Sequence, residues 1–152
     1  MPDYLEKFEK MRVAGKLAAQ TLDMLTENIE EGISTDYIDK LSYEFIRDNG
    51  GYSAPLFYRG FKKSLCTSLN HVVCHGIPTS DRILKEGDAL NIDVTAVVNE
   101  HYGDTSRMFC IGKTSVKVNN LIDATYESMM RAISLLKPGL KLGDIGYEIQ
   151  SF

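Results

Sequence analysis

Several features that mark particular protein classes are scarce or absent in this sequence of 152 residues. No apolar run approaches the roughly 20 residues that a membrane-spanning helix needs. The first residues lack the basic-then-apolar pattern of a signal peptide. The densest group of basic residues is Arg59-Gly-Phe-Lys62-Lys63, and the formal net charge is −4, so neither nucleic acid nor a membrane is an expected partner.

Cysteine is also scarce, and its placement argues against a disulfide framework. The three cysteines, Cys66, Cys74 and Cys110, are an odd number and show no CxxC spacing. Such cysteines favour free thiols in a reducing compartment, so we expect a cytoplasmic protein. With 43% hydrophobic and 25% charged residues, the composition is that of a globular protein, and we expect residues 1–152 to belong to a single domain.

Helical periodicity at both ends of the sequence encloses a middle part rich in strand-forming residues. We expect helices from Tyr4 to Asn28, from a cap at Ser34 or Thr35 to the Asn49-Gly50-Gly51 stop, and from Ser115 to Leu136. β-Branched and apolar runs predict strands over residues 64–73, 89–98 and 102–111. The order of these elements predicts an α/β (α+β) protein in which helices cover an antiparallel sheet.

The last segment of the sequence repeats the order of the first. In the first part, Gly32 separates a helix from a second helix that bears Ile38. In the last part, Gly139 separates a helix from a segment that bears Ile145, and each matched residue lies 107 positions after its counterpart. This order predicts a pseudo-two-fold repeat of which the first half and the start of the second are present, with roughly a hundred further residues expected. The alternative is that residues 141–152 are simply a C-terminal helix.

Asp93 and Asp104 are the sharpest candidates for chemistry, because both lie in strand patterns where a carboxylate is unfavourable. If Asn99-Glu100 is a two-residue hairpin turn, Thr95 faces Asp104, and the two aspartates point to one face about 7–8 Å apart. From there, their side chains can approach a pair of metal ions ~3.5–4 Å apart. A register shift of one residue would instead separate them onto opposite faces.

Two carboxylates on one buried face repel each other, and a divalent cation between them would remove the conflict. The alternative is that one aspartate is a turn residue and the other caps a helix or lies on a solvated face. Spacing alone leaves both interpretations open.

Further candidates lie within the first predicted strand or close to either end of it. His75 lies between an apolar strand and a turn, which suits either a site residue or a structural hydrogen-bonding histidine. The strand-forming residues beside Cys74 predict a buried thiol rather than a nucleophile. Tyr58, Phe61 and Cys66 suit the wall of an apolar pocket or ordinary core packing, and their residue types do not decide between these.

Four runs of the sequence resemble type I methionine aminopeptidases, and the resemblance extends along essentially the whole chain. These runs are Lys10-Met-Arg-Val-Ala-Gly15, Ser64-Leu-Cys-Thr-Ser-Leu-Asn-His-Val-Val-Cys-His-Gly-Ile-Pro78, Glu86-Gly-Asp-Ala-Leu-Asn-Ile-Asp-Val-Thr95 and Gly103-Asp-Thr-Ser-Arg-Met-Phe109. The resemblance implies the duplicated pita-bread fold, and two divalent metal ions (cobalt, manganese, iron or zinc) with Asp93 and Asp104 among their ligands.

The resemblance also implies roles for the other candidates. His75 is expected to contact the substrate near the scissile bond, and Tyr58, Phe61 and Cys66 to line the pocket for methionine. Arg59 stands where many bacterial relatives carry a histidine, and Phe61 where many carry a tyrosine. The remaining metal ligands, one histidine and two glutamates, are expected beyond Phe152, so residues 1–152 alone are expected to be inactive.

The activity implied is removal of the initiator methionine from nascent polypeptides whose second residue is small. The resemblance further implies a monomer, with the ribosome as a further partner. Two alternatives are a proline-directed aminopeptidase of the same fold and a non-catalytic protein-binding member of it. Both Asp93 and Asp104 are present, which argues against the non-catalytic alternative.

Overall fold

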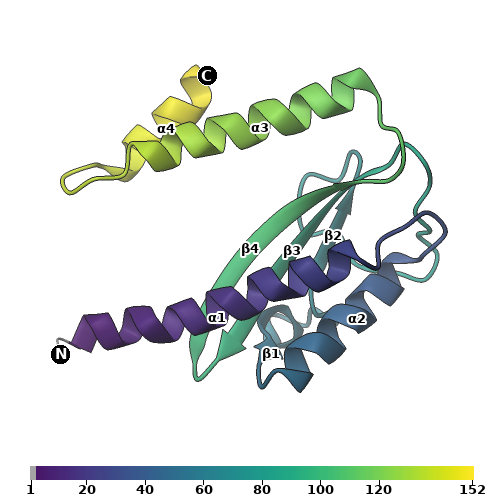
Figure 1. Ribbon diagram of the computed structural model, residues 1–152, viewed down its shortest axis with the longest axis horizontal. Helices are drawn as coiled ribbons and strands as arrows, with labels where there is room; N and C mark the ends of the chain where they lie inside the picture. The colour runs from purple at the N-terminus through teal and green to yellow at the C-terminus, as the bar shows by residue number, and fades with distance from the viewer. Residues whose placement is uncertain (1–2) are drawn as a thin grey trace. The chain divides into compact units, whose positions relative to one another are not determined.

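The computed structural model describes residues 3–152, which form two compact units that divide between Thr114 and Ser115. The first unit contains α1 (Asp3–Thr26), α2 (Thr35–Asp48), β1 (Tyr52–Ser53), the 3-10 helix η1 (Ala54–Phe57), β2 (Cys66–Leu69), β3 (Ala89–Val98) and β4 (His101–Cys110). The second contains α3 (Val116–Ser134) and α4 (Leu142–Ser151) (Figure 1). Among these residues, none of the helices has the length and apolar character needed to cross a membrane.

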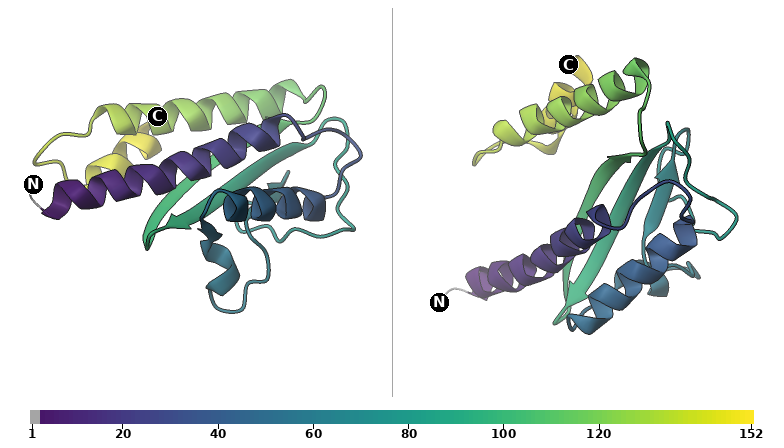
Figure 2. Two further views of the ribbon diagram at one scale, coloured as in Figure 1. Left: turned by 60° about the horizontal axis from the view of Figure 1, so that its bottom comes forward. Right: turned by 45° about the vertical axis from the view of Figure 1, so that its right-hand side comes forward.

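The first unit is built on an antiparallel sheet with β3 at its centre. β1 and β2 pair with β3 on one side, and β4 pairs with it on the other. α1 and α2 lie on one face of this sheet (Figure 2). Alternate residues of β3, namely Leu90, Ile92, Val94 and Ala96, are fully buried against these helices. Because side chains alternate along a strand, Asn91, Asp93 and Thr95 face the opposite side.

The β3–β4 hairpin turns at Asn99-Glu100, as predicted. Both residues adopt the left-handed conformation, with φ of 48° and 63°, as a two-residue type I′ turn requires. The turn fixes the register, so that Thr95 pairs with Asp104 and Asp93 pairs with Ser106. The structure therefore confirms the expected pairing, and both aspartates belong to the face opposite α1 and α2.

The boundaries of the helices follow the capping residues of the sequence. Ser34 caps α2, and its hydroxyl accepts a hydrogen bond from the Tyr37 amide at 3.1 Å. Asn49 ends the same helix, and its side-chain amide donates to the Phe45 carbonyl at 2.8 Å. The predictions for the helices are confirmed, with shifts of one or two residues at their ends.

The predicted strand over residues 64–73 is wrong in its second half, because β2 ends at Leu69. Asn70 has a φ of 53°, and its side-chain carbonyl accepts a hydrogen bond from the Ala89 amide at 3.0 Å. Asparagine tolerates this conformation and bonds the nearby backbone, so the chain turns away from the sheet. Val73 consequently is 94% exposed in spite of its strand propensity.

The second unit repeats the order seen at the start of the first. Ser115 caps α3, and its hydroxyl accepts a hydrogen bond from the Val118 amide at 3.3 Å. Gly139 lies between the two helices with a φ of 92°, close to the 93° of Gly32 between α1 and α2. α4 begins at Leu142, which is 107 positions after the first residue of α2. These local features agree with the predicted repeat.

We expect Gly103→Ala to destabilise the first unit, because β4 approaches α1 there without room for a side chain. A Cβ atom at Gly103 would lie 2.2 Å from the Ala14 carbonyl carbon and the Gly15 nitrogen. The backbone of α1 would have to move, and we expect a loss of about 2 kcal/mol in the free energy of unfolding. Urea denaturation measures the change.

Gly15→Ala is the matched control, since no atom beyond its own helix lies within 4 Å of a Cβ atom at that position. Alanine favours a helix over glycine, so this variant should keep or raise the urea midpoint. An unchanged midpoint for Gly103→Ala would show that the approach of β4 to α1 is less close than described.

Candidate functional site

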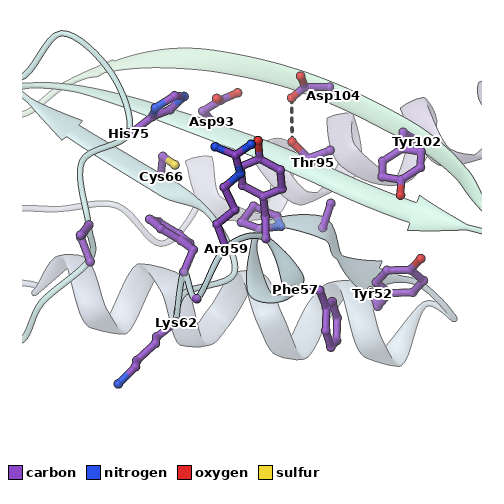
Figure 3. Close-up of a pocket in the computed structure, with 16 residues that line it drawn as sticks. Tyr52, Phe57, Arg59, Lys62, Cys66, His75, Asp93, Thr95, Tyr102 and Asp104 are labelled. Carbon is purple, nitrogen blue, oxygen red and sulfur yellow. Dashed lines mark hydrogen bonds between the residues drawn. The ribbon is translucent and has the colours of Figure 1, made fainter.

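An open cleft of about 1150 Å³ lies along the face of β3 and β4 that is opposite α1 and α2 (Figure 3). The loop after η1 and the loop after β2 complete its walls. The six site residues predicted from the sequence all line this cleft: Tyr58, Phe61, Cys66, His75, Asp93 and Asp104. The structure thus brings together residues that are up to 46 positions apart in the chain.

The two carboxylates come from neighbouring strands and point to the same side of the hairpin (Figure 3). Asp93 is half-buried, whereas Asp104 is exposed. The Thr95 hydroxyl donates a hydrogen bond to Asp104 Oδ1 at 2.9 Å, which fixes the orientation of that carboxylate. Burial raises the pKa of Asp93, and the negative charge of Asp104 raises it further, while His75 opposes both effects.

Cys66 is buried beside the carboxylates, since it pairs with Asp93 across β2 and β3. Burial, followed by the charge of Asp93, raises the pKa of its thiol to about 11. Cys66 is therefore a neutral, apolar part of the cleft wall near pH 7. The prediction of a buried Cys74 is wrong, because β2 ends before it and Cys74 is exposed in the following loop.

His75 reaches the cleft from a loop that is tied to β2. The Thr67 amide donates to the Gly76 carbonyl at 2.8 Å, and the Gly76 amide donates to Ser68 Oγ at 3.2 Å. A Cβ atom at Gly76 would lie 2.1 Å from the Thr67 carbonyl oxygen, so only glycine permits this approach. His75 itself has a φ of 54°, an uncommon conformation that occurs preferentially at functional sites.

Tyr58 and Phe61 lie on the loop after η1, which has a turn of its own. The Tyr58 amide donates to the Pro55 carbonyl at 3.0 Å, and the Phe61 amide donates to the Tyr58 carbonyl at 2.9 Å. At the end of this loop, the Ser64 amide donates to Asp39 Oδ1 at 2.6 Å, which holds the loop against α2. The loop is therefore fixed at both ends.

The sequence reasoning missed several residues of the cleft. Thr95 could have been predicted as a site residue, because the hairpin register places it opposite Asp104. Phe57 and Tyr52 also line the cleft, and their rings meet edge to face at 5.6 Å. These two aromatic residues belong to a strand of two residues and a single 3-10 turn, which are too short for any periodicity to predict.

The donor chemistry of the site fits a divalent cation in part. Asp93 and Asp104 supply oxygen ligands on one face, and their mutual repulsion is the kind that a cation relieves. Within residues 3–152, no group of three or more histidine, cysteine, aspartate or glutamate side chains is arranged to hold a metal ion. The two carboxylates can therefore form part of a ligand set that needs further donors.

We expect Asp93→Asn to stabilise the metal-free protein at neutral pH. The pKa of Asp93 is raised in the folded state, so its charged form opposes folding at every pH above that pKa. The penalty disappears as the pH falls below the ordinary value of 3.8, because aspartate is then protonated in both states. The melting temperature of the variant should exceed that of the unchanged protein at pH 7, and the two should converge near pH 3.

Asp23→Asn serves as the comparison, because Asp23 Oδ1 lies 2.8 Å from Nη2 of Arg107 and the substitution removes an ion pair. That variant should gain no stability at pH 7. A lower melting temperature for Asp93→Asn than for the unchanged metal-free protein at pH 7 would contradict the electrostatic description of the site.

Residues 9–152 match the model of metallopeptidase family M24. The methionine aminopeptidase of Rickettsia prowazekii is 52% identical over 145 residues, which cover 95% of this chain and 56% of that protein. Its crystal structure superposes with a TM-score of 0.93 over 96% of this chain and 58% of that one. The methionine aminopeptidase of Escherichia coli K12 is 45% identical over 97% of this chain and 56% of its own length.

A more distant solved structure shares the fold. The Xaa-Pro dipeptidase of Bacillus anthracis is 16% identical, with a TM-score of 0.84 over 96% of this chain and 39% of that one. The chain spans a little more than half the length of the curated relatives it matches. Its sheet, helices and partial repeat are those of the pita-bread fold, as predicted. On the match over residues 9–152, the chain belongs to metallopeptidase family M24.

Proposed function

We propose that the complete protein is a metal-dependent aminopeptidase that removes the N-terminal methionine from polypeptides with a small second residue. The observation that carries this proposal is the position of Asp93 and Asp104, on one face of a hairpin and beside a partly apolar cleft. The 52% and 45% identity to methionine aminopeptidases supports the choice of substrate.

In this proposal, Asp93 and Asp104 hold divalent metal ions together with ligands from outside residues 3–152. The bound ions would supply Lewis-acid activation of water and of the first peptide carbonyl. The Thr95 hydroxyl donates a hydrogen bond to one oxygen of the Asp104 carboxylate, which leaves the other oxygen to bind a metal ion. Cys66 stays protonated beside Asp93, so it adds no thiolate charge to the metal-free site.

His75 and the apolar wall would bind the substrate. His75 is exposed on a loop pinned to β2, where its ring can donate a hydrogen bond to the peptide at the bond that breaks. Tyr58, Phe61 and Cys66 would receive the methionine side chain. The polarisable thioether makes favourable contacts with aromatic rings, and a neutral thiol adds no charge to the pocket.

We propose two divalent ions drawn from cobalt, manganese, iron and zinc, all of which suit a site of mixed carboxylate and imidazole ligands. We also propose a cytoplasmic monomer that acts on nascent polypeptides at the ribosome. The free thiols of Cys66, Cys74 and Cys110 support a reducing compartment.

We expect Asp93→Ala and Asp104→Ala each to lower methionine release by more than about 100-fold in the complete protein, because each removes a proposed metal ligand. Release of free methionine from Met-Ala peptides measures activity, and elemental analysis of the purified protein measures bound metal. Both quantities should fall together. Residues 1–152 alone should release no methionine, since part of the ligand set lies elsewhere.

Asp48→Asn is the control, because Asp48 is an exposed aspartate on α2, in the same unit as the cleft but not among the residues that line it. It should retain both metal and activity. Full activity in either alanine variant would rule out the proposed metal site. Cleavage of Xaa-Pro peptides in place of Met-Ala would identify a proline-directed enzyme. Metal binding without hydrolysis of either peptide would favour a non-catalytic role.

A further inference from the structure

The loop after η1 carries three cations, and their surroundings differ. Lys63 contacts the Asp36 carboxylate, and its Nζ lies 3.7 Å from Asp39 Oδ2. Arg59 and Lys62 have no such neighbour, since no carboxylate among residues 3–152 lies within ion-pairing distance of either. Lys63 thus helps to hold the loop on α2, whereas the positive charges of Arg59 and Lys62 remain unpaired.

Of the two unpaired cations, Arg59 is the one directed along the cleft. Its guanidinium lies 5.3 Å from the centre of the Tyr58 ring and extends toward β3, the strand that carries Asp93 and Thr95 (Figure 3). The Lys62 side chain points away from β3 in the same view. Stacking on an aromatic face leaves the N–H groups at the edge of a guanidinium free to donate.

The backbone of Arg59 is held in a conformation that few arginines adopt. Its φ is 47°, and Gly60 follows with a φ of 80°. A side chain in this left-handed region costs free energy, and such residues occur preferentially where the surrounding structure holds a side chain for function. Here the surrounding structure is the turn between Tyr58 and Phe61 and the anchor of Ser64 on Asp39.

The chemistry of a guanidinium selects its ligand. Arginine presents a planar fork of donors that matches a carboxylate, which it often binds through two parallel hydrogen bonds. A peptide that begins with methionine has a positive amino group, a neutral first side chain and, in the proposed substrates, a small second one. A negative group can therefore only come from the third residue onward or from the C-terminal carboxylate.

We propose that Arg59 is a specificity-determining residue that binds a carboxylate of the substrate on the far side of the scissile bond from methionine. This inference rests on the proposed aminopeptidase function and adds to it a preference for substrates with an acidic group close behind the second residue. The interaction lies away from the reacting atoms, so it should lower KM and leave kcat nearly unchanged.

The test compares peptides cleaved by the complete, metal-loaded protein. Met-Ala-Glu-Ser-amide should exceed Met-Ala-Gln-Ser-amide in kcat/KM by about two- to fivefold at low salt, the range expected of an exposed ion pair. Met-Ala-Lys-Ser-amide should be the poorest of the three. Added salt should reduce the difference, because it screens exposed charges. A parallel pair, Met-Ala-Gly as free acid and as amide, measures the effect of a C-terminal carboxylate.

Variants then assign the preference to one side chain. Arg59→Gln should bring the ratio of kcat/KM for the glutamate peptide to that for the glutamine peptide to about one. Arg59→Glu should make the lysine peptide the best substrate of the three. Arg47→Gln is the matched control, because Arg47 also lies over a tyrosine ring, 5.7 Å from Tyr43, but stands on α2 outside the cleft. It removes the same charge and should leave the ratio unchanged.

Each outcome decides the question. A ratio near one in the unchanged protein, or a ratio that survives Arg59→Gln, overturns the inference while leaving the aminopeptidase function in place. A preference for glutamate that is lost in Arg59→Gln supports it, and the acid and amide pair shows whether a C-terminal carboxylate is also bound. Absence of methionine release from every peptide would overturn the proposed function and this inference with it.

Discussion

The two-residue turn at Asn99-Glu100 is the constraint on which the candidate site depends. Both residues hold left-handed conformations, and together they fix which residues of β3 and β4 face each other. One residue more or less in this turn would move one of the two aspartates to the face covered by α1 and α2. The same register places Gly103 where α1 passes close to the sheet, so the packing of the core and the position of the carboxylates have a common origin.

The two faces of the hairpin have opposite requirements, and the alternation of side chains meets both. One face buries Leu90, Ile92 and Val94 with the helices, which supplies the apolar burial that stabilises the unit. The other face carries Asp93, whose pKa is raised by burial and, after that, by the negative charge of Asp104. The stability of the unit therefore comes from the helix side, and the opposite side is left free to hold groups that are unfavourable for folding.

Much of this arrangement could be predicted from the sequence. Capping at Ser34 and the alternation along β3 are local signals, and the hairpin register followed from the turn. The end of β2 could not be predicted, because it depends on the contact of Asn70 with Ala89, 19 positions away. The exposure of Cys74 was missed for the same reason, since β-branched neighbours predict a strand when the long-range hydrogen bond is not known.

We propose that the β3–β4 hairpin places Asp93 and Asp104 to share a pair of divalent ions. Anomalous diffraction from crystals of the complete protein grown with manganese tests this most directly. Two manganese peaks, each within coordination distance of oxygen atoms from these aspartates and about 3.5–4 Å apart, are the result expected. Peaks bound elsewhere, or no peak beside either carboxylate at saturating manganese, would contradict the account.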